Sequence, residues 1–352
     1  MKREKLGQSD VEVSAFSLGT MTFGNQTDQA DAHAQIDRAL DAGITFLDCA
    51  EMYPVNPVRA ETAGRSEEII GTWIARTGRR QDIEIATKVA GNGSAVRDGE
   101  GYDGAIIRRT IDASLKRLQT DVIDLYQLHW PMRGGYAFRQ NWGYDPSGQD
   151  RAATIAHMED VLAALSDAVA AGKIRAFGLS NDTAWGTVRW IDTAARVGGP
   201  RVASVQNEYS LLARLYDTDM AEMAVNEGVT LLAYSPLAAG LLTGKYQDGA
   251  LPDGSRMAVD LATGGKGNLG GRKTARVFDA VAAYHALARE YGLDPIHMAL
   301  AWLRTRPFPV VPILGATSLA QLDHQLAGLD TPIPEALKTA INDLHHAWPL
   351  PY

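Results

Sequence analysis

Four polar side chains stand at the ends of short apolar segments or just beyond them: Asp48, Tyr53, Lys88 and His129. A tyrosine, with an ordinary pKa of about 10, donates a proton poorly at neutral pH unless a nearby ammonium favours its phenolate. Lys88 can supply that ammonium, and a buried ammonium keeps its proton only beside a carboxylate such as Asp48. A neutral His129 can donate a hydrogen bond that orients a carbonyl oxygen. Together the four predict proton transfer to a carbonyl group.

Taken singly, each of these side chains has an ordinary structural alternative. Asp48 can cap the segment that follows it, Lys88 can be solvated at a strand end, and His129 can be a hydrogen-bonded core histidine. The chemistry therefore depends on a fold that brings the four together. In a parallel barrel, polar residues at the carboxyl ends of the strands face one site.

Helical patterns alternate with apolar segments along the chain. Gly43, Gly172 and Gly228 each join a helical pattern to an apolar segment, because glycine tolerates the left-handed conformation that ends a helix. The helix before Gly172 has an apolar stripe at three- and four-residue spacing: Met158, Val161, Leu162, Leu165, Ala168 and Val169. Eight strands are predicted at about residues 16–19, 44–48, 83–87, 122–128, 174–179, 203–206, 229–233 and 309–313.

Eight such alternating units predict an α/β fold, a single (β/α)8 barrel that spans residues 1–352 as one domain. A doubly wound open sheet is the structural alternative. It usually has a glycine-rich turn of the form G-x-G-x-x-G after its first strand, and residues 18–24 do not match that pattern. Residues 3–14 alternate as a short β-hairpin would, and we expect them to cap the bottom of the barrel. Residues 131–152 and 244–273 are predicted to be long functional loops.

The composition excludes several classes of protein. The chain carries 34 Lys and Arg residues against 42 Asp and Glu, and its net charge of −8 disfavours nucleic acid and anionic membrane surfaces as partners. Its single cysteine, Cys49, excludes an intrachain disulfide framework and fits a reducing compartment. The amino terminus lacks the apolar run of a signal peptide, so we expect a cytoplasmic protein.

The order Asp, Tyr, Lys, His occurs in the contexts Leu47–Tyr53, Ala86–Lys88 and Leu128–Pro131, and this pattern resembles the aldo-keto reductase superfamily. The resemblance extends nearly end to end, and the residues that carry it also include 172–181, 205–209 and 233–246. Residues 21–24, 50–55, 114–121 and 314–317 are most similar to the bacterial Tas-like branch, which uses NADP(H). That branch is also similar to potassium-channel β-subunits.

The resemblance implies reduction of a small-molecule carbonyl substrate by hydride transfer from a nicotinamide, without a metal. Tyr53 would be the general acid, Lys88 would lower its pKa, Asp48 would hold Lys88, and His129 would orient the carbonyl. Tyr53 and His129 would also line the substrate pocket. The other pocket residues would be Met21, Trp130 and Trp142.

The resemblance also implies a set of NADP(H) contacts. Ser180, Asn181 and Gln206 would bind the nicotinamide carboxamide, and Tyr234 would stack on the ring. The remaining cofactor contacts would come from the strand ends and their loops: Gly19, Thr20, Met21, Ser235, Pro236, Leu237, Gly240, Leu241, Lys245, Arg256, Gly315, Thr317, Gln321 and Gln325. Among these contacts, the loop that begins with Ser235, Leu237 and Gly240 would hold the pyrophosphate on its backbone amides.

The sequence departs from many members of the superfamily at the adenosine 2′-phosphate. Their basic clamp after the last strand is replaced here by Gly315, Ala316 and Gln321. Lys245 and Arg256 stand where the branch places this positive charge. The segment 257–271 is also richer in glycine than related sequences, which predicts a loop that closes loosely or becomes ordered when the cofactor binds.

Three other functions remain alternatives. A barrel aldolase would use Lys88 as a Schiff-base lysine, but it would leave Tyr234 and Gln206 unexplained. A metal-dependent hydrolase is disfavoured because the eight histidines are scattered and only His345 and His346 are close in sequence. An NADP(H)-sensing regulatory subunit with slow residual reductase activity is the alternative from a different class.

Overall fold

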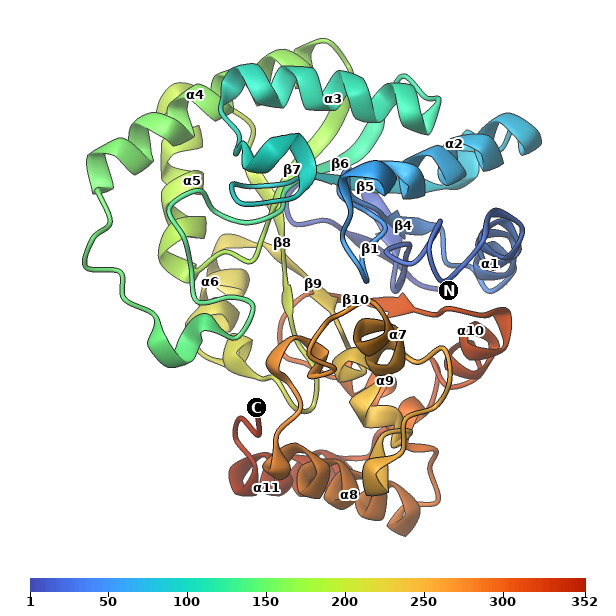
Figure 1. The fold of residues 1–352 in the computed structure, drawn as a ribbon. Helices are drawn as coiled ribbons and strands as arrows, with labels where there is room; N and C mark the ends of the chain where they lie inside the picture. Colours follow the sequence, from blue (N-terminus) through green and yellow to red (C-terminus); the bar gives the residue numbers. More distant parts are fainter.

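Eight parallel strands close into a barrel in the computed structural model, which describes residues 1–352 (Figure 1). The ring order is β10, β3, β4, β5, β6, β7, β8 and β9. The strands are β3 (Ser17–Gly19), β4 (Phe46–Asp48), β5 (Glu84–Val89), β6 (Ile123–Leu128), β7 (Ile174–Ser180), β8 (Val202–Glu208), β9 (Thr230–Tyr234) and β10 (Val310–Gly315). The predicted (β/α)8 barrel and its eight strand positions are confirmed.

Helices surround the barrel because each parallel connection must cross back over the outside of the sheet (Figure 1). They are α1 (Gln29–Asp41), α2 (Arg65–Thr77), α3 (Gly104–Leu118), α4 (Arg151–Ala170), α5 (Ala184–Val197), α6 (Asp219–Glu227), α7 (Arg256–Ala262), α8 (Ala275–Glu290), α9 (Pro295–Leu303), α10 (Leu319–Leu326) and α11 (Glu335–Ala347). None of them is long and apolar enough to cross a membrane.

The helix-to-strand joints have the predicted backbone conformation, since Gly43, Gly172 and Gly228 have φ values of 81°, 72° and 61°. The predicted apolar stripe on α4 is buried from Met158 to Ala168, but Val169 is exposed. Val169 therefore lies outside the stripe, which ends at Ala168.

The apolar core has two parts. The larger part lies between the strands and the surrounding helices, and the smaller part fills the lower interior of the barrel with side chains such as Phe46, Leu125 and Leu232. The predicted hairpin, β1 (Arg3–Lys5) paired antiparallel with β2 (Glu12–Ser14), adds Leu6, Val11 and Val13 to the smaller part. The turn of this hairpin approaches the barrel closely, because a Cβ on Gly7 would lie 2.4 Å from the Ala203 carbonyl oxygen.

The two predicted loops differ in how they are built. Residues 131–150 are irregular except for a short 3-10 turn at Gln140–Gly143. The second stretch was expected to be a loose, glycine-rich loop, but it contains α7 and buries Met257, Leu269 and Arg272. Ser255 caps α7 by accepting a hydrogen bond from the Ala258 amide. Buried side chains and a capped helix therefore anchor this stretch between its glycines.

Candidate active site

The four predicted catalytic residues meet at the carboxyl ends of neighbouring strands. Asp48 ends β4, Lys88 lies near the end of β5, and His129 directly follows β6. Tyr53 lies in the loop after β4. The other three residues lie at the same edge of the barrel because β4, β5 and β6 are paired in parallel register. All four side chains are buried. The structure therefore brings together the group that the sequence predicted from separate segments.

Lys88 is the centre of this group. Its Nζ donates to Asp48 Oδ2 at 2.8 Å and to the Cys49 carbonyl oxygen at 2.6 Å, and it lies 3.4 Å from the Tyr53 hydroxyl. Burial disfavours the ammonium, but the charges of Asp48 and Tyr53 outweigh it and raise the pKa of Lys88 above its ordinary value. The lysine is therefore a fixed positive charge beside the phenol, and a neutral amine for Schiff-base chemistry is disfavoured.

Tyr53 and His129 present their uncharged forms to the space above Lys88, and their rings meet edge to face with centroids 5.8 Å apart. Burial raises the pKa of Tyr53, and Lys88 only partly opposes this effect. The expected net lowering of the Tyr53 pKa is therefore not seen, because burial destabilises the phenolate more than the Lys88 ammonium stabilises it. Burial and the nearby Lys88 charge hold the pKa of His129 well below its usual range.

Two glutamines hold the other oxygen of Asp48. Gln206 Nε2 donates to Asp48 Oδ1 at 2.7 Å, and Gln127 Nε2 does so at 3.3 Å. Gln206 was predicted as a carboxamide ligand, whereas Gln127 was missed. A sequence signal existed, because Gln127 is a polar residue within an otherwise apolar strand and is paired in register with Lys88.

A second network links the ends of β7 and β9 to His129. Asn181 Nδ2 donates to the His129 carbonyl oxygen at 2.9 Å, and Tyr234 donates its hydroxyl proton to Asn181 Oδ1 at 2.8 Å. Ser180 Oγ donates to the Gln206 carbonyl oxygen at 2.9 Å. The four residues predicted to surround a nicotinamide thus form one connected group beside His129.

The turn after β9, where the pyrophosphate was predicted to bind, has several residues in the left-handed backbone region. Ser235, Ala239 and Gly240 have φ values of 54°, 56° and 91°. The Gly240 amide donates to the Leu237 carbonyl oxygen at 2.9 Å, so it is already used within the turn. Leu241 is buried beneath this turn, and Pro236, which has no amide proton, is buried as well. Of the predicted backbone donors, the amides of Ser235 and Leu237 carry no hydrogen bond in the chain.

Two cations in the segment that follows this turn have no acidic partner. Lys245 lies against Gly240, where a Cβ would come within 3.2 Å of its Nζ, and it makes no ion pair. Burial lowers the pKa of Lys245. Arg256 begins α7 and also lacks an ion pair, and burial together with the charges of Arg272 and Arg139 lowers its pKa to about 10. An unpaired, partly buried cation is costly, so both side chains are suited to an anionic ligand.

The residues predicted for the adenosine end lie around β10 and α10. Gln325 Nε2 donates to the Gly315 carbonyl oxygen at 2.8 Å, while its buried Oε1 has no partner. Gln321 Oε1 accepts from the Thr317 amide and hydroxyl at 3.0 and 3.2 Å. At the opposite end, His129 Nδ1 is also buried without a partner. Gln325 Oε1 and His129 Nδ1 are therefore buried polar atoms whose hydrogen-bonding capacity is unused within the chain.

Glu208, at the end of β8, gathers three distant segments and was missed by the sequence analysis. Its carboxylate accepts from Arg272 Nε at 2.7 Å, from Arg139 Nη1 at 3.1 Å and from the Tyr352 hydroxyl at 3.1 Å. We call these four residues the Glu208 cluster. The positive neighbours, Arg272 foremost, outweigh burial and lower the pKa of Glu208. The cluster joins the 131–150 loop, the 244–274 segment and the carboxyl terminus.

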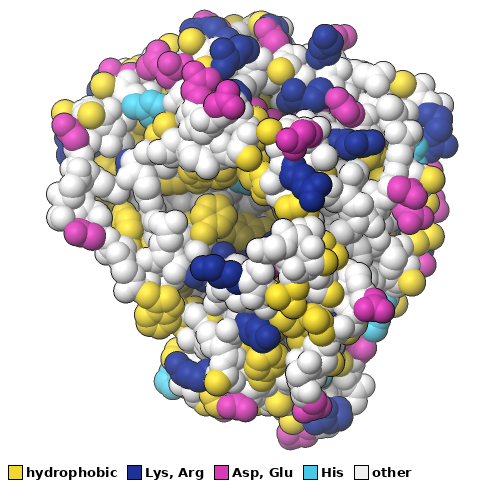
Figure 2. All heavy atoms as spheres, in the orientation of Figure 1, with side chains coloured by type: hydrophobic (Ala, Val, Ile, Leu, Met, Phe, Trp, Pro, Cys, Tyr) yellow, Lys and Arg dark blue, Asp and Glu magenta, His cyan; other side chains and the backbone are white.

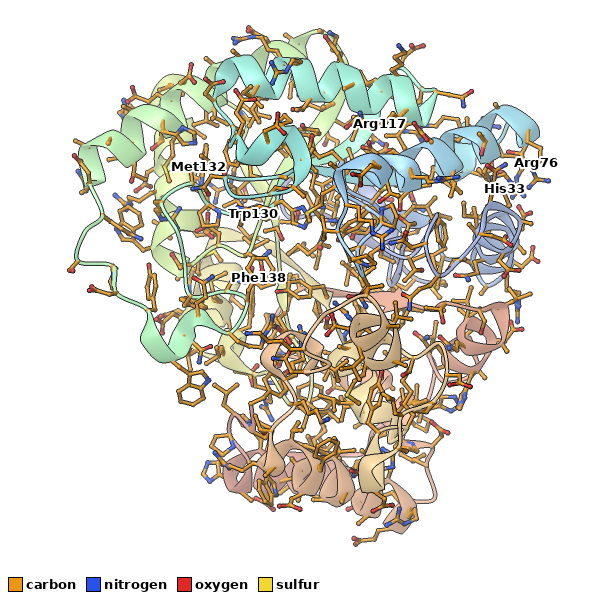
Figure 3. The ribbon with its side chains drawn as sticks, in the orientation of Figure 1. His33, Arg76, Arg117, Trp130, Met132 and Phe138 are labelled. Carbon is orange, nitrogen blue, oxygen red and sulfur yellow. The ribbon has the colours of Figure 1, made fainter.

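The predicted pocket residues divide into two groups. Met21 is half-buried just beyond β3, after Gly19 and Thr20, which are buried and were predicted as cofactor contacts. Trp130 packs against His129, with ring centroids 5.1 Å apart, and against Phe138 at 6.1 Å (Figure 3). Trp142 is 69% exposed on the 3-10 turn, and the structure does not bring it into this group.

The molecular surface is hollowed near the centre of the face shown in Figure 2. Hydrophobic side chains line the hollow, and Lys and Arg side chains lie at its rim (Figure 2). A recess lined by hydrophobic side chains is typical of small-molecule sites.

Comparisons with known proteins agree with this geometry. Residues 15–345 match the family model described as "Aldo/keto reductase family". The chain is 43% identical to "Protein tas" of Escherichia coli (strain K12), over 100% of this chain and 99% of that protein. It is 32% identical to "Uncharacterized oxidoreductase YrpG" of Bacillus subtilis (98% and 96% covered). It is also 32% identical to "Probable voltage-gated potassium channel subunit beta" of Arabidopsis thaliana (94% and 92% covered).

Proposed function

This chain belongs to the aldo/keto reductase family of oxidoreductases, and from that premise we propose that it reduces aldehydes or ketones to alcohols with NADPH. The observation that carries the proposal is the buried contact of the Lys88 ammonium with both Asp48 and the Tyr53 hydroxyl. A fixed positive charge beside a protonated phenol is the arrangement that a general acid for a carbonyl oxygen requires.

The side chains divide the work as follows. His129, held neutral, donates a hydrogen bond to the substrate carbonyl oxygen and so fixes its position. Reduced nicotinamide, when bound, supplies the hydride that adds to the carbonyl carbon. Tyr53 gives its hydroxyl proton to the carbonyl oxygen, and the C=O double bond becomes a C–OH single bond. The phenolate that remains is stabilised by the Lys88 ammonium until solvent returns a proton.

Asp48 acts through Lys88. Gln206 and Gln127 hold one oxygen of its carboxylate, so the other stays directed at Lys88 Nζ. Without that carboxylate, burial would favour the neutral amine, and the charge that stabilises the phenolate would be lost. Asp48 is thus a positioning residue for the ammonium.

The cofactor residues fit a dinucleotide that carries several negative charges. Ser180, Asn181 and Tyr234 lie at the catalytic end, while Gln321 and Gln325 lie at the far end. Between them, the 235–240 turn and the unpaired Lys245 and Arg256 offer backbone and cationic contacts. The unpaired charges support NADPH over NADH, because the extra 2′-phosphate is the group that distinguishes the two.

Replacement of Tyr53 by Phe tests the proposal, with NADPH and an aromatic aldehyde as the assay. Loss of the proton donor should lower kcat by about 10²–10⁴-fold. Fluorescence titration should give an unchanged Kd for NADPH, because the hydroxyl faces the substrate. Tyr291→Phe, at the end of α8, is the matched control and should keep the parent activity. A Tyr53→Phe enzyme with parent turnover would rule out this general acid.

One relative suggests a second candidate function. The similarity to a protein named as a probable potassium channel β-subunit favours an NADP(H)-sensing regulatory subunit as the alternative. Tight NADPH binding by the parent protein, with no turnover across a panel of aldehydes and ketones, would support that alternative over the reductase.

A further inference from the structure

A carboxylate and two imidazoles lie together where α9 begins, outside the catalytic group. Asp294, His297 and His324 each offer one ligand atom, and these atoms all lie within 4.8 Å of one another. The sequence hid this group, because His297 and His324 are separated by 27 positions and only His345 and His346 are close in the chain. The packing of α9 against α10 brings the two histidines together.

The carboxylate is held in place by the helix that it caps. Asp294 Oδ1 accepts hydrogen bonds from the amides of Ile296 at 2.8 Å and His297 at 3.2 Å. Its other oxygen, Oδ2, lies 3.0 Å from His324 Nε2. One oxygen therefore fixes the carboxylate, and the other points toward the second helix.

The two imidazoles are also oriented before any ligand arrives. Their ring centroids are 5.1 Å apart in an edge-to-face arrangement, and His297 Nε2 lies 2.7 Å from the His324 carbonyl oxygen. The His297 ring occupies the space opposite Gly328, where an added Cβ would lie 2.1 Å from its Cγ. The position of this ring thus depends on the missing side chain at residue 328.

We propose that Asp294, His297 and His324 form a binding site for a transition-metal dication, with Zn²⁺ as the reference ion. Two imidazole nitrogens and one carboxylate oxygen form a common ligand set for Zn²⁺, and water can complete the coordination. Hard cations such as Mg²⁺ favour oxygen ligands and should bind far more weakly. The ion would take the place of the hydrogen bond between His324 Nε2 and Asp294 Oδ2.

The position of the site gives it a structural consequence. His324 lies on α10, beside Gln325, and α10 also carries Gln321. A bound ion would tie α10 to the start of α9 and restrain the helix that presents these two glutamines. The metal site does not depend on the proposed reductase activity, because its ligands take no part in the catalytic group.

Isothermal titration calorimetry with ZnCl2 on the full-length, untagged protein tests the proposal. We expect one equivalent of Zn²⁺ to bind at pH 7.5, with weaker binding at pH 5.5, because protons compete for the imidazoles. MgCl2 should give no saturable heat. Zn²⁺ should also raise the melting temperature, since an ion that binds only the folded chain stabilises it.

Two variants identify the ligands without removing the helix cap. His324→Gln changes an exposed side chain, and Asp294→Asn keeps a residue that caps helices well. Each should weaken Zn²⁺ binding by about tenfold or more, a loss of the size seen when a metal site is disturbed. His346→Gln removes an exposed histidine elsewhere and should bind Zn²⁺ like the parent. No saturable Zn²⁺ binding, or equal binding by the parent and both variants, would overturn the proposal.

Discussion

Two carboxylates at the mouth of the barrel are paired with cations, but the cations come from different kinds of structure. Asp48 meets Lys88 across two paired strands, and both side chains are buried. Glu208 also ends a strand, yet its arginine partners, Arg139 and Arg272, lie on the two long connections. The first pair is fixed by the ladder of the sheet, whereas the second joins segments that the sheet does not hold.

The difference in charge balance matches this difference in support. The Asp48 and Lys88 charges cancel, and the remaining carboxylate oxygen is satisfied by amides. Around Glu208, Arg139 and Arg272 exceed the single negative charge, and the unpaired Arg256 lies close enough to be affected by both. A closed, neutral pair suits a proton-transfer step, while an excess of positive charge on loops suits an anion that enters and leaves.

The largest effect is expected when the strand-borne pair is broken by Lys88→Met. Removal of the ammonium leaves Asp48 buried without a counter-charge and Tyr53 without its stabilising cation. Aldehyde turnover should fall by about 10²–10⁴-fold. The free energy of unfolding should fall by about 3–5 kcal/mol, as measured by urea denaturation. Lys116→Met, an exposed change on α3, is the control, and a Lys88→Met enzyme of parent activity would separate the pair from the chemistry.

Charge reversal at Lys245 or Arg256 tests the excess of positive charge. Each change should raise the Kd for NADPH by about tenfold or more, a cost of ~1.4 kcal/mol or greater. The Kd for NADH should change much less, because NADH lacks the 2′-phosphate. Fluorescence titration with the two cofactors side by side gives the ratio. Lys273→Glu, exposed in the same stretch, is the control, and equal losses for both cofactors would refute the phosphate role.

Glu208→Gln tests whether the loop-borne cluster fastens the site rather than performing the reaction. Arg139 and Arg272 would lose their partner, so we expect faster NADPH release in stopped-flow displacement. The free energy of unfolding should fall by about 3 kcal/mol. The single-turnover rate with bound NADPH should stay near that of the parent. Glu159→Gln, whose partner Arg196 is largely exposed, should change neither quantity, and a slow single turnover in Glu208→Gln would place Glu208 in the chemistry.

The smallest effect is expected in the pH dependence of stability that is due to His129, next to the strand-borne pair. The pKa of His129 is depressed in the folded protein, so the unfolded chain takes up a proton first, below its ordinary pKa of about 6.5. Stability should therefore be unaffected by His129 above that pH and should decline below it, by up to about 1.4 kcal/mol per pH unit. His129→Gln should lose less stability than the parent between pH 7.5 and 5.5 in urea denaturation. His33→Gln is the control, and an identical decline in parent and His129→Gln would contradict the depressed pKa.

The same two regions mark what the sequence could predict. Asp48, Lys88 and His129 could be predicted from the sequence because each stands where an apolar strand ends, and a barrel brings such ends together. Glu208 also ends a strand, but its importance lies in Arg139, Arg272 and Tyr352, which are 64 or more positions away. Contacts of that kind depend on how loops fold over the mouth, and no periodicity encodes them.

Other differences have equally local causes. Trp142 was expected in the pocket, yet it is exposed on a short turn. The 244–273 stretch was expected to be irregular because of its glycines. Ser255 nevertheless caps α7 there, and Met257 and Leu269 find apolar partners that only the folded barrel provides.

The amino-terminal hairpin has a consequence for the order in which the molecule can assemble. Leu6, Val11 and Val13 are synthesised before every strand of the barrel, but they pack against side chains on strands as late as β10, such as Val311 and Ile313. Pairing of β10 with β3 closes the ring and joins residues almost 300 positions apart. Contacts so distant in sequence form slowly. The hairpin therefore keeps these apolar side chains uncovered until β10, far later in the sequence, has been synthesised.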